Sequence, residues 1–517
     1  MLYDSSLITV TNNGRLVDKL NPIETQRLKH NRAIKGLCDA LPAETEIMDI
    51  FHHRSYWWLM WRESFGLLWG NEEDTTFESF ATRAVKNSHP CLLGTLLVCL
   101  AFSTGEHARY LPTVERWILN DDELASSKYG FQCLMALGLC LLSAMQPRRA
   151  WTVYRRANTL LQLHGIHRRH RDSALLDSLF WQLFAADRWA SLLIGLPYSV
   201  PENLCDLYIP PMAETTPVEY HYRHMTLLTG RVIDYLQSVQ GPSLATAIAI
   251  DEQIDEMTAH LPPGYVDLAQ ISVCQDAKEK YIRIFRVTQI HQLKSLLYLP
   301  LFLQPTGDSQ GHDRQGYART ACGGSARAVL EAFLEIYESN QSMASIDNGV
   351  KLTGFTALTA AVILFLSLIG DLSGDHRRHY EGLIDRTNAA LEGCSEGKPR
   401  SLCGQCHTTL EALVTSSRDV GKGAAVQKVA VPYFGFLSIG RRQHSPAGEG
   451  LDQDEANTVP NDVAPDVDDN ALDPSLEDIF WSYQGPWMGH CDMACLPTAE
   501  DESFSNFNFP AMNEVLF

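Results

Sequence analysis

The C-terminal part of this 517-residue chain has no lysine or arginine. Residues 443–517 contain no lysine or arginine but hold sixteen aspartates and glutamates, so they carry most of the net charge of −20 and leave −4 for residues 1–442. An even spread of −20 would argue against contact with nucleic acid, because phosphates repel an acidic surface. The uneven spread instead indicates a nearly neutral body followed by an acidic tail.

Signals for export or membrane insertion are also missing. The first residues, MLYDSSLITVTNNGRL, lack the basic start, apolar centre and small-residue cleavage site of a secretory signal. The longest apolar run, residues 355–369, is interrupted by Thr356, Thr359 and Ser367 and is shorter than the roughly 20 residues that a bilayer-spanning helix needs. We therefore expect an intracellular protein without a membrane segment, in which residues 355–369 form a buried core helix.

Cysteine is scarce at the front of the chain, where Cys38 is the only one before residue 90. Most of the thirteen cysteines stand singly in apolar stretches, where a reduced thiol behaves as a small hydrophobic group. Two tighter groups of cysteine and histidine, in residues 403–407 and 490–495, each offer ligands for half a zinc site. Because these groups lie far apart in the sequence, we predict no metal site.

Catalytic motifs are absent as well. The chain has no Gly-rich phosphate loop, no nucleophile elbow and no helix with paired metal ligands. Residues 120–123 resemble the metal motif of all-α terpene cyclases, but the acid that this motif needs further along is missing. His164, His167 and His170 recur every three residues, but Gly165 interrupts the helix that would align them as ligands. We predict no catalytic residue, no cofactor and no bound metal.

The chain does contain a long succession of helical patterns. Residues 147–165 open with a proline and close with a glycine, and Trp151, Tyr154 and Leu161 fall on one face of the helix that they predict. A second helix, over residues 174–193, has a wide apolar surface. Further apolar helices are expected at residues 88–103, 128–145, 219–238, 276–298, 318–339 and 350–370. None of these stretches alternates as a strand does, so we predict an all-α fold built as one large multi-helix array.

These patterns divide the chain into three regions. Residues 1–30 lack apolar periodicity and are interpreted as an N-terminal extension, and residues 31–440 as one all-helical domain. Residues 441–517 are rich in Pro, Asp, Asn and Gly, which predicts a disordered acidic tail. Bulky apolar groups among its acids are typical of an activation segment that enters a coactivator groove. The residues expected to bind a coactivator are Phe480, Trp481, Tyr483, Trp487, Phe504, Phe507 and Phe509.

An ordered series of short motifs runs through residues 151–210. A helix ends at the turn Leu-His-Gly-Ile-His, an aromatic-rich helix then carries Asp187 and Arg188, and an acidic-to-proline stretch closes the series. This order resembles the middle homology region of fungal transcription factors of the zinc binuclear cluster family, although Leu196 stands where the family usually has arginine between glycine and proline. The resemblance, with weaker echoes over residues 40–370, implies an all-α regulatory domain in a nuclear transcription factor.

Members of this family usually carry six closely spaced cysteines that hold two zinc ions and present a helix to the DNA major groove. No such cluster occurs in these 517 residues, so we do not expect them to bind DNA by themselves. The expected partners are transcriptional coactivators, from the composition of the acidic tail, together with a second copy of the chain or a DNA-binding partner.

We therefore interpret the chain as a nuclear transcription regulator, and as a positive regulator of a pathway-specific gene set such as a specialised-metabolite cluster. Two alternatives stay open at this point: an all-α enzyme of specialised metabolism, and a scaffold that holds another regulator without binding DNA. Asp187 and Arg188 are expected to form a buried ion pair that fixes helix register, because a charged pair in an apolar helix is more often structural than catalytic.

Overall fold

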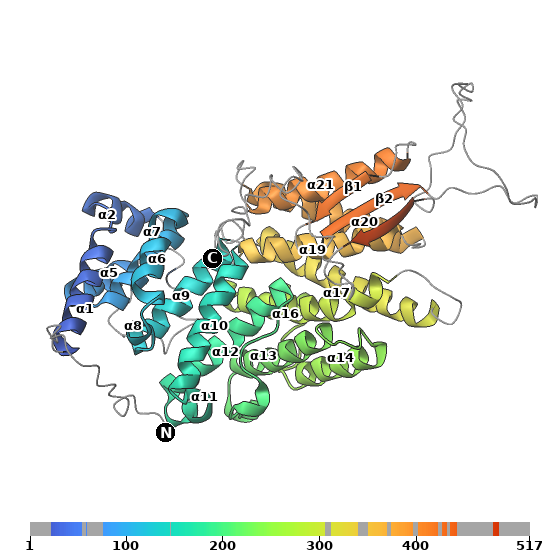
Figure 1. Ribbon diagram of the computed structural model, residues 1–517. Coiled ribbons are helices and arrows are strands. Elements are labelled where there is room, and N and C mark those ends of the chain that lie inside the picture. The colour runs from blue at the N-terminus through green and yellow to red at the C-terminus, as the bar shows by residue number, and fades with distance from the viewer. Residues whose placement is uncertain are drawn as a thin grey trace, which may run out of the picture. The chain divides into compact units, whose positions relative to one another are not determined.

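A computed structural model shows the chain as a succession of helices followed by a small sheet (Figure 1). It describes residues 22–53, 58, 76–144, 146–304, 312–339, 350–369, 374–395, 402–421, 427–431, 435–441 and 479–484. Nearly all of the described elements are helices, which confirms the predicted all-α class. The chain divides into two compact units, Met1–Cys140 and Leu141–Phe517. The helical pattern does not mark this boundary, because it falls inside α9, Lys128–Ser143.

The first unit is built around α6, Pro90–Thr104, which is buried continuously from Pro90 to Ala101. A helix with no polar face must be covered on all sides, and its neighbours in the unit supply that cover. They are α1 (Pro22–Cys38), α2 (Glu44–His53), α5 (Phe77–Asn87), α7 (His107–Val114), a π-helical turn (Glu115–Leu119) and α8 (Asp122–Ala125).

The first helix begins earlier than predicted. α1 starts at Pro22, whereas the sequence pattern predicted an irregular extension up to residue 30. Ala33 and Leu37 of α1 are buried, and Gly36 lies so close to the indole of Trp117 that a side chain on it would clash. This contact face contains small residues and few large apolar ones, so its periodicity is weak in the sequence although the helix packs against α6.

Helices of the second unit begin and end at the signals that predicted them. α10, Pro147–Leu163, has its proline in the first turn and is followed by Gly165 in the left-handed conformation. α12, Ala174–Ile194, begins after Ser173, whose side chain accepts a hydrogen bond from the Leu176 amide, and ends at left-handed Gly195. Between these helices lie α11 (Ile166–Arg169) and a 3-10 turn (His170–Asp172). The predicted helices at 147–165 and 174–193 are confirmed.

The remaining helices form a layered array in which α16 and α17 pack along each other and α17 packs against α19 and α20 (Figure 1). The predicted core helix at 355–369 is confirmed as most of α19, whose Ala357, Leu358 and Val362 are buried. No helix in the described part of the chain is long and apolar enough to cross a bilayer. The helices after α12 are α13 (Pro217–Leu236), α14 (Leu244–Ala259), α15 (Leu268–Ser272), α16 (Ala277–Phe302), α17 (His312–Ser339), α19 (Val350–Ile369), α20 (Gly374–Cys394) and α21 (Leu402–Gly421), with 3-10 turns at Glu202–Leu204 and Met212–Glu214.

A three-stranded antiparallel sheet was not expected from the sequence. Its strands, β1 (Gln427–Val431), β2 (Gly435–Arg441) and β3 (Ile479–Gln484), are ordered β1-β2-β3. Leu437 and Ile439 of β2 are fully buried while Ser438 between them is partly exposed, which is the alternation of a strand with one covered face. Three positions are too few to stand out in a helical sequence. β3 lies inside the tail that was predicted to be disordered, so that prediction is wrong for these six residues. The rest of the tail, residues 442–478 and 485–517, lies outside the described residues.

Candidate functional site

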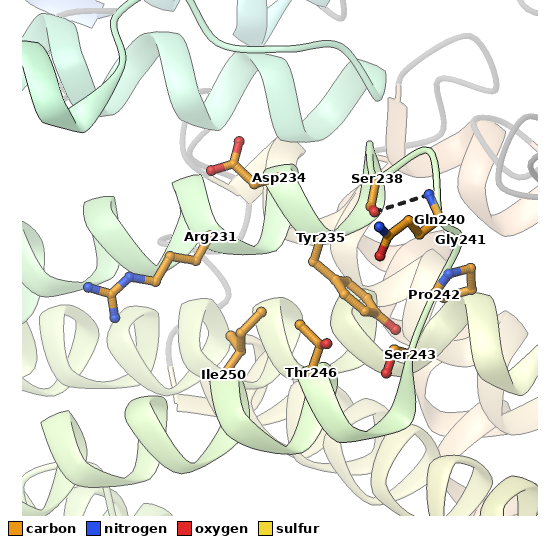
Figure 2. Close-up of a pocket in the computed structure, with 10 residues that line it drawn as sticks. All are labelled: Arg231, Asp234, Tyr235, Ser238, Gln240, Gly241, Pro242, Ser243, Thr246 and Ile250. Atoms are coloured by element: carbon orange, nitrogen blue, oxygen red, sulfur yellow. Dashed lines mark hydrogen bonds between the residues drawn. The ribbon is translucent and has the colours of Figure 1, made fainter.

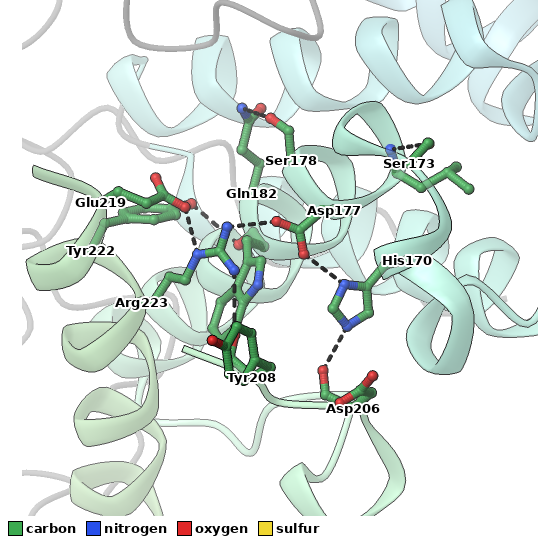
Figure 3. Close-up of polar contacts among 12 residues, drawn as sticks. His170, Ser173, Asp177, Ser178, Gln182, Asp206, Tyr208, Glu219, Tyr222 and Arg223 are labelled. Atoms are coloured by element: carbon green, nitrogen blue, oxygen red, sulfur yellow. Dashed lines mark hydrogen bonds and ion pairs between the residues drawn. The ribbon is translucent and has the colours of Figure 1, made fainter. Parts of the chain in front are cut away.

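A network of polar side chains joins four segments of the second unit (Figure 3). Asp177, in the first turn of α12, is central: its Oδ1 lies 2.8 Å from Nδ1 of His170 and its Oδ2 accepts a hydrogen bond from Nη2 of Arg223 at 2.5 Å. Arg223, on α13, also donates from Nε to Oε1 of Glu219 at 2.5 Å. Nε2 of His170 lies 2.6 Å from the carbonyl oxygen of Asp206. We call these five residues the polar seam.

His170 uses both ring nitrogens in the polar seam. Its two partners, the Asp177 carboxylate and the Asp206 carbonyl, are both acceptors, and each lies within hydrogen-bond distance of one ring nitrogen. The imidazole is fully buried and stacks on Phe180, with ring centroids 4.1 Å apart and planes 7° from parallel. A histidine held in this way is a structural side chain, because a metal ligand needs an unprotonated nitrogen free to bind.

The charges of the polar seam compensate one another. Burial acts to raise the pKa of Asp177, but the hydrogen bond from His170 and the charge of Arg223 outweigh it and hold the pKa below its ordinary value. The Arg223 guanidinium lies 5.0 Å from the ring of Trp181, and its Nη1 is 3.4 Å from the carbonyl oxygen of Tyr208. Through these contacts the polar seam holds the loop at 206–208 and α13 against α12, so its role is structural.

Asp187 and Arg188 are buried as predicted, but each binds a segment downstream of α12 instead of forming a close ion pair with its neighbour. Oδ2 of Asp187 accepts hydrogen bonds from the Ser199 amide at 2.6 Å and hydroxyl at 2.8 Å. Nη2 of Arg188 donates to the Val200 carbonyl at 3.3 Å and lies 3.8 Å from a carboxylate oxygen of Glu202. Adjacent residues on a helix diverge by about 100°, so the two side chains reach separate partners.

The environment of this pair favours structure over catalysis. The Arg188 guanidinium lies 3.4 Å from the ring centroid of Phe184 and 4.3 Å from that of Tyr198, so it is enclosed between two aromatic rings. Burial raises the pKa of Asp187 and lowers that of Arg188. Both side chains are fully buried, which removes them from contact with any diffusible substrate.

A pocket of about 500 Å³ lies where α13 ends and α14 begins (Figure 2). Its charged side chains already have partners: Arg231 donates to Gln253, and Asp234 accepts a hydrogen bond from the Tyr198 hydroxyl at 2.9 Å. Tyr235 is 5% exposed, and its buried hydroxyl has no hydrogen-bond partner. Burial raises the pKa of Tyr235 to about 12. The lining also includes the polar side chains of Ser238, Gln240, Ser243 and Thr246, so the buried Tyr235 hydroxyl is one of several polar groups around this cavity.

Other residues weighed as metal ligands have structural contacts. The Asp121 carboxylate, in the motif at 120–123, accepts hydrogen bonds from two backbone amides and caps α8. Cys403 and Cys406 are buried on α21, and burial raises the pKa of Cys406 to about 12. Nδ1 of His407 lies 2.8 Å from the side-chain oxygen of Asn388. The described residues contain no group of three or more potential metal ligands.

The predicted coactivator-binding residues fall into two sets. Phe480, Trp481 and Tyr483 belong to β3, whose backbone pairs with β2. The other four, which lie outside the described residues, are Trp487, Phe504, Phe507 and Phe509. Their role in binding a coactivator stays a prediction.

Sequence inspection missed the polar seam almost entirely. His170 was singled out only as a potential metal ligand, and neither Asp177 nor Arg223 was noticed. The one local signal is the spacing of Glu219 and Arg223, four residues apart on one helix, which favours an ion pair. The partnership of Arg223 with Asp177 joins residues 46 positions apart, and no pattern in the sequence encodes it.

The chain is similar to several curated fungal regulators, although no family model matches it. It is 28% identical over 242 residues to the transcription factor sdnS of Sordaria araneosa, an alignment that covers 43% of this chain and 30% of the relative. It is 23% identical over 495 residues to a dehydrocurvularin biosynthesis regulator of Aspergillus terreus, and this alignment covers 82% of this chain and 66% of the relative. The transcription factor eupR of a Phoma species is 25% identical over 206 residues, an alignment that covers 36% of this chain and 44% of the relative.

The chain spans between about a third and two thirds of the length of these relatives. All three are named as transcription factors or as a biosynthesis regulator, and the match to the Aspergillus terreus protein extends over most of this chain. The chain is therefore similar to fungal transcription factors and to regulators of biosynthetic pathways.

Proposed function

We propose that this protein acts in the nucleus as a positive regulator of a set of biosynthetic genes, and that its acidic C-terminal segment recruits the coactivator. The observation that carries the proposal is the composition of residues 443–517, where sixteen acidic residues and no lysine or arginine accompany bulky apolar side chains. The name of the dehydrocurvularin biosynthesis regulator supports a biosynthetic gene set as the target.

The two kinds of side chain in this segment have separate tasks. Aromatic side chains carry most of the energy at protein interfaces, because they bury a large apolar area with few rotatable bonds. The acids speed the encounter with basic partner surfaces and keep the segment soluble before it binds. In this proposal the helical units contribute the contacts to a DNA-binding partner or to a second copy of the chain.

The test uses the full chain fused to a heterologous DNA-binding module, with a reporter gene under its site. Replacing Trp487, Phe504, Phe507 and Phe509 together with alanine should lower reporter output at least fivefold, because interface aromatic residues each contribute on the order of 1–2 kcal/mol. The matched control replaces Ser505, Asn506 and Asn508 with alanine, which leaves every acid and aromatic in place and should leave output unchanged. Equal output from both variants, at equal protein levels, would contradict the proposal.

A further inference from the structure

The register of the sheet shows how the C-terminal segment meets the helical unit. β2 and β3 pair antiparallel from Phe436 opposite Gln484 to Arg441 opposite Ile479. Within this register, Trp481 is opposite Ile439 and Tyr483 is opposite Leu437, and both of these β2 residues are fully buried. Three of the seven residues predicted to bind a coactivator therefore belong to a strand that is already paired.

The sheet is part of the second unit and not a separate hairpin. Leu437 and Ile439 belong to the main hydrophobic core of that unit, together with residues of α19 and α21. β3 itself lies against α19 and α21, beside β2 (Figure 1). β2 and these two helices therefore form the surface on which residues 479–484 lie.

Connectivity favours this contact. Because β3 is joined covalently to β2, its local concentration at this surface is set by the tether and not by the amount of protein.

We propose that the edge of β2, with α19 and α21, is a binding surface for the activation segment of the same chain, and that it competes with the coactivator for residues 479–484. This inference rests on the proposed function. A strand added to a sheet edge gains main-chain hydrogen bonds that a groove-binding partner cannot use at the same time. A coactivator that binds only the released segment shifts the population toward the released form.

Docking lowers activation in proportion to the docked fraction. If residues 479–484 are docked in nine molecules of ten, the apparent affinity for coactivator falls roughly tenfold. A change that prevents docking without altering the segment should therefore raise activation by a similar factor. The structure supplies positions for such a change, because Gly440 and Arg441 pair only with β3, whereas Gly435 pairs only with β1.

The first experiment compares proline substitutions at the two ends of β2 in the tethered reporter assay. Along a strand the N–H groups point alternately to the two sides, so either Gly440→Pro or Arg441→Pro removes a donor to β3. One of these variants should raise reporter output between threefold and tenfold. A roughly tenfold increase is the limit if nine molecules in ten are docked in the native chain. Gly435→Pro, the matched control on the β1 side, should not raise output. Unchanged output in both test variants, with thermal unfolding like that of the native chain, overturns the inference.

Combining the alanine and proline variants distinguishes a failure of this inference from a failure of the proposed function. Alanine at Trp487, Phe504, Phe507 and Phe509 should lower output in both the native and the Arg441→Pro chains if the segment recruits a coactivator. If these alanines have no effect in either chain, the proposed function fails. If they lower output but neither proline variant raises it, recruitment stands and the competition fails.

A covalent lock tests the same surface in the opposite direction. Ser438 and Ser482 are directly opposite in the register, and opposite residues in antiparallel strands lie about 4.5–5.5 Å apart, within the reach of a disulfide. The Ser438→Cys/Ser482→Cys chain should activate cell-free transcription several-fold less when oxidised than after treatment with dithiothreitol, whereas Ser482→Cys alone should not respond. Failure of the two thiols to join, or full activation by the oxidised chain, refutes the inference.

Discussion

Substitution of Gly230 by alanine tests how tightly Arg188 is held. Gly230 lies on the buried face of α13, where an added Cβ would stand 2.8 Å from Nε of Arg188 and 3.1 Å from Oε1 of Glu202. The guanidinium has little room to move, because it is enclosed by the rings of Phe184 and Tyr198 and is fully buried. We expect the Cβ to displace Arg188 from the Val200 carbonyl and from Glu202.

The expected loss combines three effects. Helix propensity favours alanine over glycine by about 1 kcal/mol. Overpacking a buried site costs about 1–3 kcal/mol, and leaving a buried charge without its partners costs about 3 kcal/mol or more when nothing relaxes. With partial relaxation, Gly230→Ala should lower the free energy of unfolding by roughly 2–4 kcal/mol. This corresponds to a fall in Tm of about 3–8 °C for the unit that contains α13.

The matched control is Gly324→Ala on α17, where an added Cβ meets no atom within 4 Å. This variant should gain about 0.5–1 kcal/mol from helix propensity alone. Unfolding of both variants can be followed by circular dichroism and calorimetry, with urea titration as an independent measure. If Gly230→Ala is as stable as Gly324→Ala, Arg188 is not confined as described and the packing argument is wrong.

Two further predictions concern buried titratable groups. Burial lowers the pKa of His291 from 6.5 to about 4, and the positive charges of Lys294 and Arg327 act in the same direction. The contribution of neutral His291 to stability is therefore complete above pH 6.5 and is lost as the pH falls toward 4. The loss amounts to about 3 kcal/mol, so His291→Gln should reduce the shift in urea midpoint between pH 7.5 and 5. A His291→Gln chain with the native pH dependence would show that this group does not titrate as argued. Tyr235→Phe should leave stability unchanged or raise it by about 1 kcal/mol, because it removes a buried hydroxyl that has no partner; a loss above 1 kcal/mol in urea unfolding would reveal a bond that the hydroxyl makes.

Local chemistry explains what could be predicted from the sequence. α10 and α12 begin at a proline or a serine cap and end at a glycine with positive φ, and such signals act within a few residues of the chain. α19 was recognisable because nearly every residue in it is apolar. The class of the fold and the ends of these helices follow from such short-range patterns.

What could not be predicted depends on contacts between distant segments. Arg223 meets Asp177 across 46 positions, and β2 becomes a strand because Leu437 and Ile439 meet the helical core on one face and β3 lies along its edge. The ion pair expected between Asp187 and Arg188 failed for a related reason, since the residues that they bind, at 199–202, come from a turn with no regular pattern. Burial of the pair was predictable from the apolar helix around it, but its partners were not.

The pairing of Arg441 with Ile479 also bears on how this protein can vary among related fungi. These two residues flank the segment 442–478, so pairing of the strands fixes the distance that this segment must span. Closing a loop of twice the length costs only about 0.6 kcal/mol more. Insertions and deletions there should be nearly neutral for the sheet, and the acidic segment can evolve in length and composition while the few residues of β2 and β3 stay under selection.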